Sequence, residues 1–240
     1  MLKISKGINT IYLGLFFEKS KTLVISDLQI GMEEMYNKQG VMIPHTNFFE
    51  VKKKLKEIIE KTKPLRIIIN GDLKHEFGII SDQEWRETLK ILDLVAENNR
   101  EVILVKGNHD TILGPIALRK EIKITESFVL ENEKILFVHG HKEPTTEQLK
   151  GIELIVIGHE HPAVTITDGT KRETYKCFLK GKYKKKELIV LPSFNFVTTG
   201  SDITKERTLS PMIKNVKEFE VYAVEKDVFY MGKVGKIESI

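Results

Sequence analysis

Three polar side chains in succession, Asn108, His109 and Asp110, end the segment Glu101–Asp110, which reads EVILVKGNHD. The four apolar residues 102–105 predict a buried strand, and Gly107 ends that strand. An amide oxygen, an imidazole that changes charge near neutral pH and a carboxylate are groups that bind metals or transfer protons. Packing alone would not select all three at the end of a buried strand, so this segment is predicted to carry chemistry.

The same pattern, an apolar run followed by Asp or His, recurs at four further points of the sequence. These points are Asp27-Leu28-Gln29, Gly71-Asp72 with His75, His139-Gly140-His141 and Gly158-His159-Glu160-His161. Together with the segment 101–110, these motifs hold six of the seven histidines, and only His45 lies outside them. Functional groups in open α/β sheets gather beyond the carboxyl ends of the strands. The pattern therefore predicts that these side chains converge on one metal centre. The glycines at 71, 107 and 158 are expected to allow a sharp turn before each polar group.

The elements that must position these groups follow from periodicity. Strands with helices in the first half and strand pairs in the second half predict a layered α/β fold with large sheets. One amphipathic helix is expected from Asn47, with Glu50 completing a capping box, to Thr62, and another from a Ser81 and Glu84 box to about Asn98. Further strands are expected at 11–17, 22–26, 66–70, 127–130, 134–138, 154–157, 163–167, 173–180, 188–191, 219–224 and 228–231. Between them we expect a short helix or loop at 30–40, a short helix at 115–120, a turn at 181–186 and a loop at 192–201. No linker interrupts the sequence, which predicts a single domain over residues 1–240.

In this order the motifs resemble those of the calcineurin-like metallophosphoesterase superfamily, over about half of the chain. The resemblance implies a four-layer α-β-β-α sandwich with two mixed β-sheets and a two-metal site. It implies that Asp72 bridges both metals and that His109 is the catalytic acid, with Asp110 as its orienting partner. The other implied ligands are Asp27, Gln29 and His161 for the first metal, and Asn108, His139 and His159 for the second.

This implied site suits phosphoester hydrolysis. Two divalent ions about 3.5–4 Å apart can clamp the attacking and leaving oxygens at phosphorus and activate a water. An imidazole such as that of His109 can then protonate the leaving alkoxide. Nitrogen and oxygen ligands without thiolate, together with the resemblance, lead us to expect two divalent ions, manganese first, with iron, zinc or nickel as alternatives.

Gln29 departs from the family, which usually has His at this position. An amide oxygen is a weaker donor than an imidazole, so we expect a looser first metal site; the alternative is that Gln29 does not ligate and a water takes its place. His75 and His141 lie just beyond motif positions, and either hydrogen bonding to a ligand or direct contact with substrate would explain them. His45 is expected to be an ordinary loop residue.

The segments GDLKHE, VHGHK and LPSFN are similar to an intracellular subgroup related to DNA-ligase-associated phosphoesterases and to nuclease subunits of double-strand-break repair complexes. With a net charge of +4, this favours a phosphodiesterase acting on nucleotide or nucleic-acid phosphoesters. A phosphomonoesterase is the alternative within the same chemistry. A non-catalytic metal-binding scaffold for a partner protein is the alternative outside it, because Gln29 weakens one site. The sequence shows no basic stripe interleaved with aromatics that would mark a nucleic-acid groove.

Composition sets the remaining expectations. Apolar residues make up 41% of the sequence, which is enough for a full core. The single cysteine, Cys177, cannot form an internal disulfide, which points to a reducing compartment. The apolar stretch 11–17 is too short to span a membrane and lacks the features of a signal peptide, so we expect a cytoplasmic protein without a membrane partner. The sequence does not indicate an oligomeric state.

Overall fold

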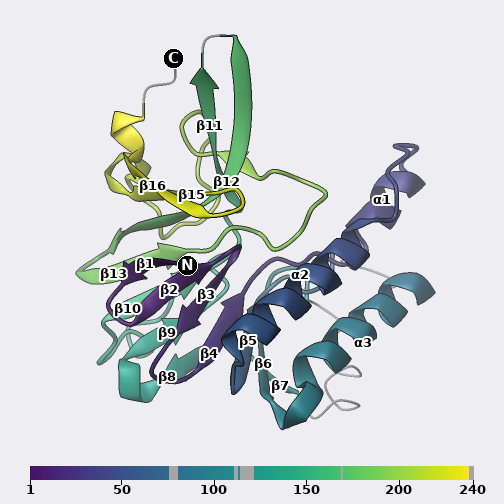
Figure 1. Cartoon of the computed structure of the whole chain (residues 1–240). Helices are drawn as coiled ribbons and strands as arrows, with labels where there is room; N and C mark the ends of the chain where they lie inside the picture. The colour runs from purple at the N-terminus through teal and green to yellow at the C-terminus, as the bar shows by residue number, and fades with distance from the viewer. Residues whose placement is uncertain (76–80, 111–112, 114–121, 169, 238–240) are drawn as a thin grey trace.

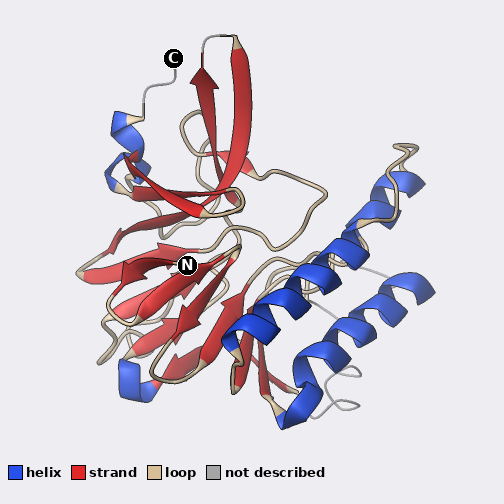
Figure 2. Cartoon of the chain, viewed as in Figure 1, coloured by secondary structure: helices blue, strands red, loops and turns tan. Residues whose placement is uncertain are grey.

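The computed structural model describes residues 1–75, 81–110, 113, 122–168 and 170–237. Two β-sheets pack face to face, and helices cover the outer face of the first sheet (Figure 1 and Figure 2). The two mixed sheets of the expected fold class are thereby confirmed. The short helix expected at 115–120 falls outside this described part of the chain.

The first sheet changes from antiparallel to parallel along its strand order. Its strands follow the chain: β1 (Leu2–Ser5), β2 (Ile8–Ile11), β3 (Gly14–Phe17), β4 (Thr22–Ile25), β5 (Arg66–Asn70), β6 (Glu101–Val105) and β7 (Lys123–Thr125). Strands β1 to β4 pair antiparallel, whereas β4 to β7 pair parallel. The single strand expected at 11–17 is wrong, because Tyr12 turns the chain with a φ of 51° between β2 and β3. The parallel half places the ends of β4, β5 and β6 along one edge.

The second sheet has the order β14-β11-β12-β13-β10-β9-β8, and β15 pairs with β12 and β16. Its strands are β8 (Phe128–Leu130), β9 (Ile135–Phe137), β10 (Leu154–Ile157), β11 (Pro162–Asp168), β12 (Lys171–Tyr183), β13 (Lys186–Val190), β14 (Ser201–Asp202), β15 (Glu220–Val224) and β16 (Val228–Lys233). Strands β9, β10 and β13 are parallel, so their carboxyl ends also share one edge. Strand β12 continues to Tyr183, which makes the expected turn at 181–186 much shorter than predicted.

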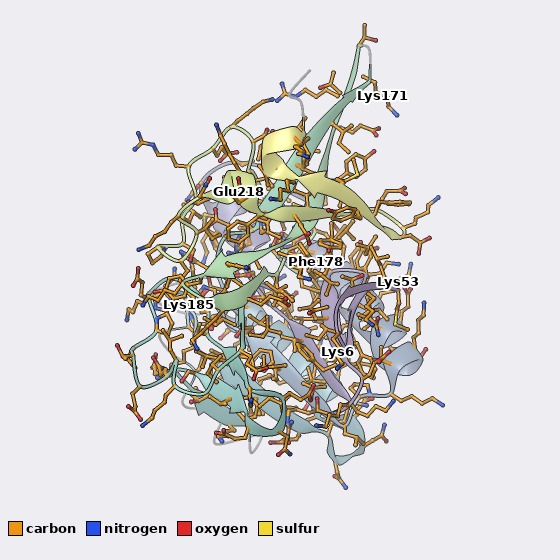
Figure 3. All side chains as sticks on the ribbon, turned by 90° about the vertical axis from the view of Figure 1, so that its left-hand side faces the viewer. Lys6, Lys53, Lys171, Phe178, Lys185 and Glu218 are labelled. Atoms are coloured by element: carbon orange, nitrogen blue, oxygen red, sulfur yellow. The ribbon has the colours of Figure 1, made fainter. Side chains whose placement is uncertain are left out.

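The core between the sheets follows the two-residue period of their strands. In β10, Leu154 and Val156 face the first sheet, whereas Ile155 and Ile157 pack on the opposite side. The rings of Phe17 and Phe137 meet across the interface with centroids 5.6 Å apart. Phe178 is fully buried, whereas the lysines labelled in Figure 3 are exposed.

Helices α1 (Met32–Lys38), α2 (Asn47–Thr62) and α3 (Asp82–Ala96) belong to the first half of the chain. The predicted apolar face of α2 is buried, from Phe48 to Ile59. Ser81 accepts a hydrogen bond from the Glu84 backbone N–H, as the predicted capping box of α3 requires, and the helix ends two residues before Asn98. Within the described chain no helix is long and apolar enough to cross a membrane.

The capping box expected at Asn47 and Glu50 is wrong. The α2 N-cap residue is Thr46, and its side chain makes no capping bond. Instead, the buried carboxylate of Glu33 on α1 accepts the backbone N–H groups of Thr46 and Asn47 at 2.6 and 2.7 Å. The side-chain oxygen of Asn47 is then available to the N–H of Phe196, 2.8 Å away in a distant loop.

The outer face of the second sheet is covered differently from that of the first. Loop residues such as Met212 and Ile213 pack on it together with Val216 and Val234. The last two begin the short 3₁₀ turns η3 (Val216–Glu218) and η4 (Val234–Lys236), and the other such turns are η1 (Glu97–Asn99) and η2 (Glu131–Glu133). Among the described residues this fourth layer is therefore made of loops and 3₁₀ turns rather than α-helices.

Candidate metal centre

The carboxyl ends of the parallel strands in both sheets meet and bring the motif residues together. Asp27, Asp72 and Asn108 follow β4, β5 and β6 of the first sheet. His139 follows β9, and His159 and His161 follow β10 of the second sheet. The predicted convergence of these side chains is visible in their mutual distances.

One group of donors forms around Asp27, which is fully buried. Its Oδ1 lies 3.1 Å from Nε2 of His161, yet this nitrogen makes no hydrogen bond to any described residue. Burial by itself raises the Asp27 pKa, but the nearby His161 and His139 imidazoles lower it to about 2. A buried nitrogen and an ionised oxygen that face each other without a hydrogen bond are suited to share a cation.

A second group forms around Asp72. One ligand atom each from Asp72, His139 and His159 lie within 4.8 Å of one another, a spacing that could hold one metal ion. The Oδ1 of Asn108 lies 3.2 Å from Nε2 of His139. The Nδ1–H of His139 donates to the carbonyl of Asn70 at 3.0 Å, which directs Nε2 towards the carboxylates.

His139 links the two groups. Its Nε2 lies 3.3 Å from Asp72 Oδ2 and 3.9 Å from Asp27 Oδ1. Burial lowers the His139 pKa, but the hydrogen bond to Asp72 and the charges of Asp27 and Asp72 raise it to about 9. By contrast, burial and the neighbouring His139 charge lower the His159 pKa to about 4. The two carboxylates therefore favour the imidazolium form of His139 in the metal-free protein.

Gln29 also lies in the site and is buried. Its backbone N–H donates to the carbonyl of Asp72 at 3.0 Å. Its side-chain Oε1 lies 3.5 Å from Nδ2 of Asn195, in the loop that follows β13. The side chain of Gln29 is therefore held by Asn195, a residue 166 positions later in the sequence.

His109 is placed beside Asp72, with its Nε2 3.9 Å from Asp72 Oδ2. Its Nδ1 pairs with the backbone carbonyl of His75 at 2.6 Å, and the two rings stack at 5.2 Å. The expectation that Asp110 orients His109 is therefore wrong, because a carbonyl takes that place.

The Asp110 carboxylate binds the backbone instead. It accepts hydrogen bonds from the N–H groups of Leu73, Lys74 and Gly107 at 3.1, 3.5 and 3.0 Å. Burial raises its pKa to about 6, against the lowering effect of the Gly107 hydrogen bond. Asp110 thus joins the loops after β5 and β6, which carry Asp72 and Asn108.

His141 borders the second group. Its ring centroid lies 5.4 Å from that of His139 and 6.1 Å from that of His159. Its Nδ1 is buried and has no hydrogen-bond partner among the described residues. Burial and the nearby charges of His139 and Lys142 lower the His141 pKa. His45 lies apart, exposed, with Asn37 and Gln83 amide nitrogens beside its ring nitrogens.

The glycines serve the site for two different reasons. Gly71 has a φ of 94° and makes the sharp turn that was expected. Gly107 and Gly158 do not have a positive φ, so the expected reason is wrong for them. A Cβ on Gly107 would lie 1.9 Å from Asp72 Oδ1, and one on Gly158 would lie 1.9 Å from Ser26 Oγ and 2.5 Å from Asp27 Oδ2. These two positions need glycine because side chains of the site and of Ser26 occupy the space.

Sequence reasoning missed two buried residues that hold the site. Glu160, between His159 and His161, accepts the backbone N–H groups of Leu209 and Ser210 at 2.8–3.0 Å. Asn195 donates to the Asp27 carbonyl at 3.3 Å as well as to Gln29. A carboxylate between two histidines was a signal for Glu160. The LPSFN segment contributed to the family resemblance, but it gave Asn195 no role at the site.

Comparisons with known proteins agree with this geometry. A search of curated proteins finds no match. Among solved structures, the nuclease MPE of Pseudomonas putida has a TM-score of 0.64 at 19% identity, covering 91% of each chain, which shows a shared fold. The phosphoesterase YfcE of E. coli has a TM-score of 0.44 at 16% identity, covering 90% of this chain and 94% of that one. The family model for calcineurin-like phosphoesterases matches residues 20–217. The chain therefore belongs to the calcineurin-like phosphoesterase family.

Proposed function

We propose that this protein is a phosphodiesterase that uses two divalent cations and acts on nucleotide or nucleic-acid phosphoesters. The observation that supports it best is that the Asp72 carboxylate lies beside both the possible cation ligands His139 and His159 and the His109 imidazole. A cation site next to a proton donor is what cleavage of a phosphoester requires.

The proposed ligands divide into two sets that share Asp72. The first set adds Asp27, Gln29 and His161, and the second adds Asn108, His139 and His159. When bound, two cations would polarise the phosphoryl group and lower the pKa of a water. Oxygen and nitrogen donors without thiolate favour manganese, with iron, zinc and nickel as alternatives.

His109 is the proposed general acid. Its Nδ1–H donates to the His75 carbonyl, so Nε2 carries a proton only when the ring is an imidazolium, the form that donates. The carbonyl fixes the ring so that Nε2 faces Asp72, where the leaving oxygen would be released. Asp110 supports this by fixing the loops on either side.

Two observations favour this substrate class. The mild positive charge of +4 suits a phosphate-rich partner. The Pseudomonas putida protein MPE, which shares the fold with a TM-score of 0.64, is a nuclease. His141, at the edge of the second ligand set, is the proposed contact for a further substrate oxygen, and His75 is proposed to act through His109. Because both sheets supply ligands, we also propose that residues 1–240 work as one domain.

The test compares hydrolysis of bis-p-nitrophenyl phosphate and p-nitrophenyl phosphate with manganese. We expect His109→Ala to lose about 10²–10⁴-fold in rate on the diester while its metal content stays that of the wild type. His45→Ala is the matched control and should keep full activity, because His45 lies in an exposed loop. Faster cleavage of the monoester would favour a phosphomonoesterase. Two bound metals without hydrolysis of either ester would favour the scaffold.

A further inference from the structure

We infer that Asn195 is a positioning residue that turns the amide oxygen of Gln29 towards the first cation, giving that site a preference for oxygen-seeking metals. This inference rests on the proposed two-cation function. It is carried by the contacts that a fully buried amide, Asn195, makes to both Asp27 and Gln29.

The orientation of Asn195 is fixed by its other end. Its Oδ1 accepts the Thr198 backbone N–H at 3.3 Å and the Thr198 hydroxyl at 3.4 Å. A backbone N–H can only donate, so the opposite end of the amide is the NH₂ group. That group donates to the Asp27 carbonyl at 3.3 Å and to Gln29 Oε1 at 3.5 Å. The Gln29 side chain must therefore present its oxygen, and not its nitrogen, to Asn195.

This arrangement leaves Gln29 able to bind a cation. An amide oxygen has two lone pairs, and Asn195 takes one of them. The Gln29 backbone is fixed as well, because it has a left-handed φ of 46° and donates to the Asp72 carbonyl. The second lone pair of Oε1 is then available to a cation held by the other ligands of the first set.

The loop that carries Asn195 is held in place by three separate elements. The Phe194 N–H donates to the Ser26 carbonyl at 2.8 Å. Lys176 of β12 donates to the carbonyl and hydroxyl of Ser193 at 3.1 and 2.5 Å. Beyond Asn195, the Phe196 N–H donates to Asn47 of α2. These bonds hold Asn195 without help from a cation, so the amide pair is preorganised.

The consequence is chemical asymmetry between the two sites. The first set would offer two carboxylates, one amide oxygen and one imidazole, whereas the second would offer one carboxylate, one amide oxygen and two imidazoles. Oxygen donors suit manganese and magnesium, and imidazoles suit zinc and iron. The first site should therefore select manganese over zinc more strongly than the second site does.

Asn195→Leu tests the positioning role, because it removes the donors while keeping the approximate size of the side chain. Isothermal titration with manganese should show one of the two affinities lowered about 10–100-fold and the other unchanged. Thr198→Val is the matched control: it removes only the hydroxyl bond to Asn195 and should leave both affinities as in the wild type. If Asn195→Leu binds both ions as tightly as the wild type, the inference is overturned.

A double-mutant cycle separates an effect through Gln29 from a general effect on the fold. In a Gln29→Ala background, Asn195→Leu should cause no further loss of first-site affinity. A loss as large as in the wild-type background would overturn the inference. If Asn195→Leu does not fold, Gln29→His decides instead: it should shift the first-site preference towards zinc by about tenfold or more, and an unchanged preference overturns the inference. A wild-type protein that binds fewer than two ions would contradict the proposed function itself.

Discussion

Cation binding should become tighter as the pH rises, because His139 holds a proton where the proposed second cation would bind. Its Nε2 lies 3.3 Å from Asp72 Oδ2 and 3.9 Å from Asp27 Oδ1. Burial lowers the pKa of this imidazole, but the hydrogen bond to Asp72 and the two carboxylate charges raise it to about 9. At neutral pH the ring is therefore protonated, and a cation must displace that proton.

The size of the effect follows from the distance between the working pH and this pKa. Below a pKa of about 9, each pH unit changes the fraction of unprotonated His139 by about tenfold. Between about pH 7 and pH 8.5 the association constant of that cation should rise about 25-fold, or about 2 kcal/mol. The rise should level off above about pH 9. His159 adds nothing in this range, since its pKa of about 4 leaves it neutral.

Isothermal titration with manganese over this pH range, in pairs of buffers with different ionisation enthalpies, measures both the affinity and the protons released. We expect release of about one proton at neutral pH on binding of the second cation. His45→Ala should show the same pH dependence as the wild type and serves as the control. An association constant that stays constant for both cations, with heats that do not depend on the buffer, would refute the assignment of the proton to His139.

Three further predictions concern residues that support the site. Asp110→Asn places an amide N–H against backbone N–H groups and should lower the free energy of unfolding of the metal-free protein by about 1–3 kcal/mol; an unchanged urea midpoint would contradict it. Gly107→Ala should lose bound metal, because its Cβ would lie 1.9 Å from a site carboxylate. Gly151→Ala is the control, since a Cβ there meets no atom within 4 Å. Equal metal content in the two variants would count against this prediction. Glu33→Ala removes the cap of α2 and should lower the free energy of unfolding by about 1–2 kcal/mol. Glu50→Ala, in the first turn of the same helix, should lower it by about 0.5 kcal/mol, and thermal unfolding of the two variants measures the difference.

The convergence of the donors could be predicted because strand direction and residue chemistry agree. Asp27 and Asp72 follow buried apolar runs, and parallel strands place their carboxyl ends along one edge. The same reasoning predicted that His139 and His159 lie at an edge where parallel strands end, which in the structure is the edge of the second sheet. The amphipathic face of α2 was also readable, since apolar residues recur there at helical spacing. Each of these signals is local, a run of neighbouring residues with a clear period.

Contacts between residues far apart in the sequence could not be predicted in this way. Glu33 caps a helix that begins 14 residues later, in place of a box within the helix itself. Asn195 reaches Gln29 across 166 residues. Neither residue lies in a periodic pattern, and a polar residue in a loop or a short helix is ordinarily exposed. Asp110 illustrates the same limit. Its position next to His109 suggested that it binds this imidazole, whereas in the structure its carboxylate accepts hydrogen bonds from three backbone N–H groups.

Backbone conformation adds a further reason to regard the site as preorganised. Five of the proposed ligands have a positive φ although none is glycine: Asp27, Gln29, Asp72, His159 and His161. Such conformations cost on the order of 1 kcal/mol each and persist only where the surroundings impose them. The surroundings here are backbone hydrogen bonds between the loops, from Asp27 N–H to Gly71, from Gln29 N–H to Asp72 and from Gly158 N–H to His139. Because these bonds join the ligand loops directly, the donor atoms are in place before a cation binds, and binding need not order the loops.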